Sequence, residues 1–369
     1  MKFICDRNTL LKEIGIAQDI IPSGSNTAIS IVSNVYLEAR DGMLTIKATD
    51  LTVYYETKVP VTVIEEGVTT VFGGKLFVFL SSFPDGEIEF SQIDKTFVIK
   101  PTSRKLKFSL RTMSEEQYPE FQSFETLDFF TMPIRDLKDM IEQTSFAVST
   151  DPARFHMNGV YFEKVNNKVI MVATDGRRLA LIEKDAGDMP DFPGAIIPIK
   201  LLATIMKCSG DEGQVSVSLT DKFFFVEFGS YKFCSILFEG QFPNYRKVIP
   251  ENQSFSFMVK RLDILQAMKR IHPLVEKQSE RLYFTIAKGS LSVYVKDSDI
   301  GSGEEDIEAS YDGEDMQFAL RYSNLEEPLR VLTTDTLKVM FTNMNQAFTI
   351  KPEPEEDYCH VMMPMQIDI

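Results

Sequence analysis

Asn167–Ala180 reads NKVIMVATDGRRLA, and the rest of the chain is best interpreted outward from this stretch. Its alternating apolar residues predict a strand that runs up to Asp175-Gly176, a dipeptide typical of a tight turn. Two other stretches repeat the pattern, GMLTIKATD at Gly42–Asp50 and GSLSVYVKD at Gly289–Asp297. The three aspartates are 125 and 122 residues apart, so the spacing indicates one module written three times.

The other predicted elements recur in the same order in each copy. Apolar residues at three- and four-residue steps predict a first helix at Arg7–Ile21, Ile134–Val148 and Val259–Ile271, the last with Leu262, Leu265 and Met268 on its apolar face. Strands follow, then a second, shorter helix at Lys75–Phe83, Lys200–Cys208 and Tyr322–Leu332. A hairpin follows in each copy, and a proline–aromatic ending closes the first two. We therefore expect an α+β fold with domains at 1–122, 123–250 and 251–369, each with two helices packed on antiparallel sheet.

Composition narrows the class of protein. The 369 residues are 44% hydrophobic and 25% charged, as in an ordinary globular chain. No apolar run approaches membrane-spanning length and the N-terminal residues lack a signal-peptide pattern, so a cytoplasmic protein without membrane contact is expected. The four cysteines and three histidines are scattered singly, which predicts no metal site, no catalytic residues and no cofactor.

The net charge of −15 argues against a protein that coats DNA through a basic surface, because such binding needs many phosphate contacts. A closed ring would avoid this objection. Open sheets leave edges at which neighbouring copies can pair. If the modules of two chains joined edge to edge with helices ~9–10 Å apart, those helices would surround a hole of roughly 25 Å, wide enough for a duplex. The periodicity permits such closure without requiring it.

Five motifs recur in the order and spacing of a known family: ATDGRRLA at Ala173–Ala180, FPNYRKVIP at Phe242–Pro250, VMMPMQI at Val361–Ile367, KFSLRTM at Lys107–Met113 and MNGVYFE at Met157–Glu163. Over essentially its whole length the chain resembles the bacterial DNA polymerase III beta subunit, the replicative sliding clamp. The resemblance implies a head-to-tail homodimeric ring around double-stranded DNA, without catalytic activity. Its partners would be the replicative DNA polymerase, the clamp loader, and other polymerases and repair proteins that carry clamp-binding peptides.

The resemblance also implies a groove for these peptides. The matching positions are Met157, Thr174, Gly176, Arg177, Arg178, Leu179, Pro243, Lys247, Val248, Asn324, Asn345, Ala347, Met363, Pro364 and Met365. Methionine and leucine side chains would give a deformable apolar pocket, and Arg177, Arg178 and Lys247 could hold the polar or acidic part of a peptide. The alternative is a tail that packs on its own core beside an ordinary exposed turn. Asn324 replaces an aromatic residue common in the family and Lys247 replaces an arginine, so the peptide preference could differ.

A mildly basic inner wall is expected from cations on the predicted helices. The candidates are Arg7, Lys12, Lys75, Arg135, Lys138, Lys200, Lys207, Lys260, Arg261, Lys269 and Arg270. Each of them could instead be a solvated helix charge. Asn26 stands where the family often carries a basic residue that touches DNA.

Two stretches of opposite charge predict the contact between chains. Lys100–Lys107 is basic and is expected to be an edge strand, whereas Gly303–Glu308 is acidic and resembles a loop. The predicted interface consists of Lys105, Lys107, Phe108, Leu110, Ile271, Leu274, Glu304 and Glu305. Joining module one of one chain to module three of the other would fix a head-to-tail order. Two solvated charge runs are the alternative.

Two other classes of protein were weighed against a clamp. Asp175 followed by two arginines would suit a phosphate or carboxylate site, but no GxxxxGK[ST], GxGxxG, GxSxG or carboxylate–histidine cluster completes an enzyme. A three-domain scaffold that binds peptides and never meets DNA is the second alternative. It predicts a monomer in solution, whereas a ring predicts a dimer.

Overall fold

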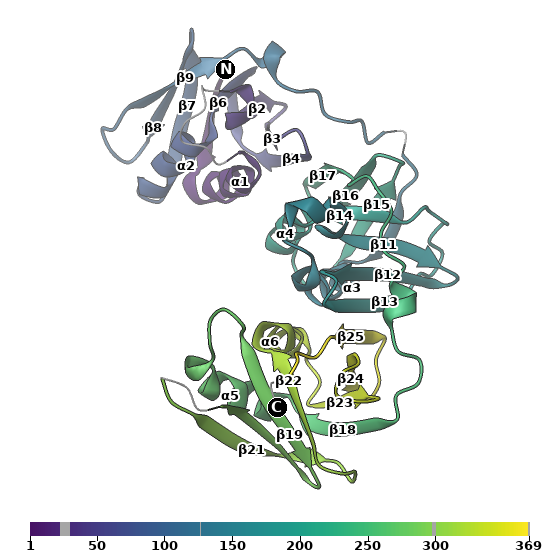
Figure 1. Cartoon of the computed structure of the whole chain (residues 1–369). Coiled ribbons are helices and arrows are strands. Elements are labelled where there is room, and N and C mark those ends of the chain that lie inside the picture. Colours follow the sequence, from purple (N-terminus) through teal and green to yellow (C-terminus); the bar gives the residue numbers. More distant parts are fainter. Residues whose placement is uncertain (23–29, 126, 297–299, 368–369) are drawn as a thin grey trace. The chain divides into compact units, whose positions relative to one another are not determined.

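The computed structural model describes residues 1–22, 30–125, 127–296 and 300–367 (Figure 1). Two of the positions discussed above, Asn26 and Asp297, lie outside this range. The chain forms two compact units: Met1–Leu137 with Asp188–Pro190 and Ile197–Leu237, and Lys138–Gly187 with Asp191–Ile196 and Phe238–Ile369. Each unit is α+β and contains one continuous antiparallel sheet, as expected. Within the described ranges, no helix is both long and apolar enough to cross a membrane.

The first unit contains a 13-stranded sheet. In spatial order its strands are β10 (Phe130–Pro133), β15 (Gln214–Leu219), β16 (Phe223–Phe228), β17 (Tyr231–Ile236), β4 (Val53–Pro60), β3 (Met43–Thr49), β2 (Asn34–Arg40), β6 (Gly67–Phe72), β9 (Phe108–Met113), β8 (Thr96–Pro101), β7 (Glu87–Ile93), β1 (Lys2–Asp6) and β5 (Thr62–Glu65). Its helices are α1 (Arg7–Ile20), α2 (Gly73–Ser82) and α4 (Ile199–Cys208), and it includes the start of α3 (Ile134–Glu142).

The second unit contains a 12-stranded sheet. Its strands are β14 (Ala195–Pro198), β11 (Gly159–Val165), β12 (Lys168–Thr174), β13 (Arg178–Asp185), β25 (Tyr358–Met362), β24 (Phe348–Glu353), β23 (Thr336–Phe341), β18 (Phe255–Lys260), β21 (Gly303–Ser310), β20 (Ser290–Val295), β19 (Arg281–Ala287) and β22 (Met316–Arg321). Its helices are α5 (Arg261–Ile271) and α6 (Tyr322–Val331), with the end of α3.

The two sheets are continuous because strands from different copies of the repeat pair with each other. Strand β17 pairs with β4 in the first unit, and β25 pairs with β13 in the second. Strands β4 and β13 are each the third strand of a meander, β2–β3–β4 and β11–β12–β13. Each pairs with a strand of the next copy that follows a hairpin: β17 follows β15–β16, and β25 follows β23–β24. The edge-to-edge joining that the repeats predicted is therefore confirmed at these two junctions.

A buried carboxylate reinforces the first junction. Glu13 of α1 is only 5% exposed. It accepts hydrogen bonds from the Tyr55 hydroxyl of β4 at 2.8 Å and from the Tyr231 hydroxyl of β17 at 3.0 Å. An acceptor that binds two hydroxyl groups offsets part of the desolvation cost of all three groups. The paired strands are thus held by one side chain as well as by their backbone.

Two first-helix predictions were wrong at one end, and the second helix predicted at Lys75–Phe83 begins two residues earlier, at Gly73. Helix α3 stops at Glu142 instead of Val148, because the Thr144 hydroxyl donates to the Met140 carbonyl at 2.6 Å and the backbone then leaves the helix. Residues 259 and 260 belong to β18, whose burial alternates as in a half-buried strand, so α5 begins only at Arg261.

The apolar face predicted for this last helix was partly wrong as well. Leu262 is 49% exposed, whereas Leu265 and Met268 are buried as expected. Ile264, Ala267 and Ile271 complete the buried face. Leu262 is nine residues, or two and a half turns, before Ile271, so it lies on the opposite, solvent side of α5.

Two strands are paired along only part of their length. Strand β9 pairs with β8 along residues 108–111, but reaches β6 only at residues 112 and 113. Strand β21 pairs with β20 along residues 303–308, but reaches β18 only at residues 309 and 310. The edge strand predicted at Lys100–Lys107 is wrong, because β8 lies between β7 and β9 and Lys105 and Lys107 lie in the exposed connection to β9. The acidic stretch Gly303–Glu308, predicted to be a loop, is part of strand β21.

Candidate functional site

An apolar cavity of about 180 Å³ lies in the second unit, at the junction of β13 with β25. The residues that line it are Met157, Thr174, Gly176, Arg177, Arg178, Leu179, Pro243, Asn244, Tyr245, Val248, Ala347, Val361 and Met363. The strand pairing places Leu179 opposite Val361, and the Met363 amide donates to the Arg177 carbonyl at 2.9 Å. The sheet junction therefore brings the tail beside the turn that follows β12.

Ten of the fifteen predicted groove residues line this cavity: Met157, Thr174, Gly176, Arg177, Arg178, Leu179, Pro243, Val248, Ala347 and Met363. The other five, Lys247, Asn324, Asn345, Pro364 and Met365, do not line it. The sequence interpretation missed Asn244, Tyr245 and Val361. All three lie inside the motifs FPNYRKVIP and VMMPMQI, so the signal was present, although it did not single out these positions.

The cavity has a rigid floor and an exposed apolar rim. Leu179, Val361 and Tyr245 belong to a buried cluster that also contains Phe242. On the rim, Val248 is 56% exposed and Met363 is 47% exposed. Apolar side chains left in water at the edge of a hollow are typical of a surface that binds another molecule. A methionine at this place can adapt to ligands of different shape.

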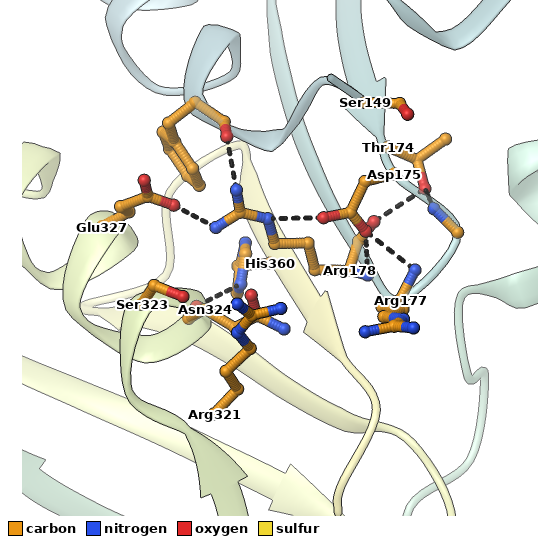
Figure 2. Close-up of polar contacts among 12 residues, drawn as sticks. Ser149, Thr174, Asp175, Arg177, Arg178, Arg321, Ser323, Asn324, Glu327 and His360 are labelled. Carbon is orange, nitrogen blue, oxygen red and sulfur yellow. Dashed lines mark hydrogen bonds and ion pairs between the residues drawn. The ribbon is translucent and has the colours of Figure 1, made fainter. Parts of the chain in front are cut away.

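The turn Thr174–Arg178 forms one wall, and its own side chains fix it (Figure 2). One Asp175 carboxylate oxygen accepts the Arg177 amide at 2.8 Å and the Arg178 amide at 3.1 Å. The Thr174 hydroxyl donates to the Arg178 carbonyl at 2.6 Å and accepts the Gly176 amide at 3.1 Å. Gly176 has φ +86°, a conformation in which a side chain would be strained. The turn is therefore closed by local hydrogen bonds.

The guanidinium group of Arg178 is directed into the protein. It donates to the second Asp175 carboxylate oxygen at 3.1 Å, to the Phe146 carbonyl at 2.6 Å and to the Glu327 carboxylate of α6 (Figure 2). It also lies 5.6 Å from the centre of the Phe146 ring, and its side chain is 10% exposed. Three of the five N–H donors of Arg178 are therefore used within the chain, and its contact with an acidic peptide group stays a prediction. Arg177 remains exposed at the cavity.

His360 is buried behind this cluster on β25. Its Nε2 donates to the Asn324 carbonyl at 3.1 Å, while Nδ1 has no hydrogen-bond partner among the described residues. Burial lowers the pKa of His360 from the ordinary 6.5 to about 3, and the nearby positive charge of Arg178 acts in the same direction. His360 is therefore neutral at neutral pH.

Some cations predicted to face DNA already have partners in the structure. Arg7 donates to the carbonyls of Leu80 and Ser81 at 2.7 and 3.1 Å, at the end of α2. Arg261 donates to Leu329 near the end of α6 and to a carbonyl just beyond it, both at 2.9 Å. Positive charge at a helix C-terminus is stabilising, so both arginines have a structural role.

Four more of these cations form ion pairs within their own unit: Lys12 with Glu13, Lys200 with Asp50, Lys207 with Asp19, and Arg270 with Glu305. The last pair joins a predicted DNA contact to a predicted interface residue. Its Nε–Oε2 distance is 2.7 Å, and the contact raises the pKa of Arg270 and lowers that of Glu305. Lys12, Lys75, Arg135, Lys260 and Lys269 are exposed, as are the paired Lys207 and Arg270, whereas Lys138 is half-buried. Their role in DNA contact stays a prediction.

The comparisons with known proteins agree on one family. Three domains of the DNA polymerase III beta subunit match this chain. The N-terminal domain matches residues 1–122, the central domain 131–244 and the C-terminal domain 246–366. The chain is 42% identical to the beta sliding clamp of Treponema pallidum and 27% identical to that of Escherichia coli K12, with all of each chain covered.

Solved structures agree as well. The sliding clamp of Bartonella birtlesii bound to griselimycin is 28% identical, with a TM-score of 0.92 over all of both chains. The Caulobacter crescentus beta sliding clamp is 26% identical, with a TM-score of 0.91 over 100% of this chain and 99% of that one. The repeated sheet-and-helix fold is thus that of a sliding clamp. The chain belongs to the DNA polymerase III beta subunit family, the bacterial beta sliding clamps.

Proposed function

We propose that two copies of this chain close into a ring around double-stranded DNA and tether the replicative polymerase to it. Family membership supports this function. The ring itself would hold DNA by enclosure, would be placed by a clamp loader and would have no catalytic activity. In this proposal the domains are 1–122, 123–250 and 251–369, and the protein works in the cytoplasm, where bacterial DNA lies.

The observation that best supports a ring is that β9 and β21 are each paired along only part of one side. Each internal junction joins the third strand of a meander to the strand after a hairpin. Strand β21 is the third strand of its meander and β9 follows a hairpin, and both have an open side. An open edge invites pairing with another chain. A third junction of the same kind, between β21 of one chain and β9 of the other, would close a head-to-tail dimer.

The internal junctions also give a register for this contact. Phe233 lies opposite Tyr55, and His360 lies opposite Ala180. Tyr55 pairs with Ala48 and Ala180 pairs with Ala173, and each of these alanines is two residues before the repeated aspartate of its copy. The equivalent residue of the third copy is Val295, which pairs with Gly303. In the first copy, Phe108 pairs with Ile99 of the hairpin strand β8, as Phe233 pairs with Val226 of the hairpin strand β16 in the second copy, so Phe108 is the equivalent of Phe233. Phe108 of one chain would therefore lie opposite Gly303 of the other.

This register has chemical support. Counting from Phe108, Lys107 would lie opposite Glu304 and Lys105 opposite Asp306, so opposite charges would meet across the strands. Phe108 packs against Phe79 and Phe83 of its own chain, at ring distances of 5.0 and 5.1 Å, and would add an apolar centre.

Two predicted interface residues are given different places. Ile271 is 4% exposed and belongs to the core of its own chain, so it would support the interface from behind. Leu274 is half-buried, and a Cβ atom at Gly303 would lie 2.9 Å from it. Leu274 would therefore lie directly beneath the strand that receives the second chain.

The cavity at the β13–β25 junction would bind partner peptides. Its apolar rim supports this assignment, as does its formation by residues from four motifs that carry the family resemblance. The relative from Bartonella birtlesii was solved bound to griselimycin, which supports a ligand-binding site on this chain as well. In the proposal, segments of the polymerase, the clamp loader and repair proteins compete for this cavity.

Retention on DNA tests the proposed function. The purified chain is loaded on nicked circular DNA with a clamp loader and washed at high salt. A ring should stay on the circle and leave when the circle is cut, because topology and not charge holds it. Release from the intact circle at high salt would contradict enclosure. Light scattering should give twice the mass of one chain, whereas a peptide-binding scaffold would give the mass of one.

A further inference from the structure

Glu327 lies outside the cavity, yet it is connected to it. It is on α6, 149 residues after Arg178, and is not among the residues that line the hollow. Its carboxylate binds the Arg178 guanidinium, which in turn binds Asp175 (Figure 2). Asp175 accepts the two amides that shape the turn on the cavity wall. An unbroken chain of charged contacts therefore runs from α6 to that wall.

Building on the proposed peptide-binding function, we infer that Glu327 and Asp175 are positioning residues of the cavity, acting through Arg178. The Arg178 side chain is 10% exposed and that of Glu327 is 35% exposed, so the contacts are partly shielded from water. Charge-assisted hydrogen bonds in such places are stronger than neutral ones. Without Glu327, Arg178 loses one of its two carboxylate partners and its hold on the Asp175 turn is weakened.

The first junction shows what the second has added. There Asp50 accepts the amides of Thr52 and Val53 at 2.9 and 2.7 Å, as Asp175 does in the next copy. Its second oxygen pairs with Lys200 of α4, whose Nζ also donates to the Ile20 carbonyl. Both junctions thus tie a turn to the second helix of the following copy. At the second junction that turn is also a wall of the cavity, so the tie can control binding.

The chain offers matched controls for this inference. Glu327→Gln removes the charge, and Glu327→Asp keeps it on a shorter stem. Glu326→Gln changes the neighbouring acid of the same helix, whose nearest cation is Arg330 at 4.0 Å. Lys200→Gln breaks the corresponding ion pair of the first junction.

Calorimetric titration with griselimycin measures binding to each variant. Glu327→Gln should weaken binding about tenfold, the effect of one charge-assisted hydrogen bond. Glu327→Asp should recover part of the loss, whereas Glu326→Gln and Lys200→Gln should bind as the parent chain does. Arg178→Gln combined with Glu327→Gln should weaken binding no more than Arg178→Gln alone, because both act through one contact.

A second measurement separates this inference from the proposed function. In protein labelled at the methionine methyl groups, Glu327→Gln should shift the NMR signals of Met157 and Met363, and Glu326→Gln should not. Unshifted signals together with unchanged binding would overturn the inference while leaving the peptide site intact. If the parent chain does not bind griselimycin, the binding proposal loses its support, and the methyl signals still decide whether Glu327 positions the cavity.

Discussion

Acid should destabilise the folded chain through one buried imidazole. His360 is 0% exposed, and burial followed by the charge of Arg178 lowers its pKa from 6.5 to about 3. The unfolded chain binds a proton at this residue near the ordinary pKa, but the folded chain does not. Between these two values the unfolded state therefore carries more protons, so stability must fall as the pH decreases from 6.5 toward 3.

The size of the effect follows from the same two values. A shift of one pKa unit corresponds to about 1.4 kcal/mol. From pH 7 to pH 5, protonation of His360 stabilises the unfolded state by the equivalent of about 1.5 pKa units, and the folded state gains no such stabilisation. The free energy of unfolding therefore falls by about 2 kcal/mol. The Nδ1 atom of His360 has no partner among the described residues that would stabilise a proton in the folded chain.

The assay compares the parent chain with His360→Gln by urea unfolding at pH 7 and pH 5. Glutamine can still donate to the Asn324 carbonyl but does not titrate. All other groups contribute equally to both proteins, so the difference between the two pH dependences isolates this imidazole. The parent should lose about 2 kcal/mol more than the variant. Equal losses in the two proteins would refute the argument.

Three further predictions concern other parts of the chain. Glu13→Ala leaves two buried tyrosine hydroxyls without their acceptor and should lower the stability of the first unit by about 2–4 kcal/mol. Glu13→Gln keeps an acceptor and should cost less. Thermal unfolding compares the two variants, and equal losses would contradict the role of the shared acceptor. Reversing the charge at Lys105 and Lys107 should weaken the dimer most at low salt, and a dimer dissociation constant that is the same in parent and variant at every salt concentration would exclude the proposed strand contact. Deleting residues 363–369 should abolish polymerase binding in a pull-down assay and leave the dimer intact; loss of the dimer would show that the tail is structural.

Much of the fold could be predicted because its signals are local and repeated. The apolar steps of the first helix and the alternation before Asp175 each lie within a few residues, and three copies reinforce them. The errors occurred where a local signal was overridden. Thr144 ends α3 by binding its own backbone, and the half-buried alternation of β18 continues into what was interpreted as helix.

The site could be predicted only in part, because its contacts are distant in the sequence. The motifs identified most of the cavity wall, but they carried no information on the direction of the Arg178 side chain. That direction depends on Glu327, 149 residues away, and on the Phe146 carbonyl. Likewise, the charge pattern indicated two complementary segments without showing that β9 and β21 have open sides.

The repeated aspartate shows how the first two copies share a turn but differ in its surroundings. Asp50 and Asp175 each accept the amides two and three residues further on, so the repeat preserves the turn. The second oxygen is where the copies differ: Asp50 pairs with Lys200 from the next module, whereas Asp175 pairs with Arg178 of its own turn. Arg178 is then available to Glu327, and the same turn becomes both a junction and a wall of the cavity. The two described turns thus share their backbone hydrogen bonds and differ in the partner of the second carboxylate oxygen.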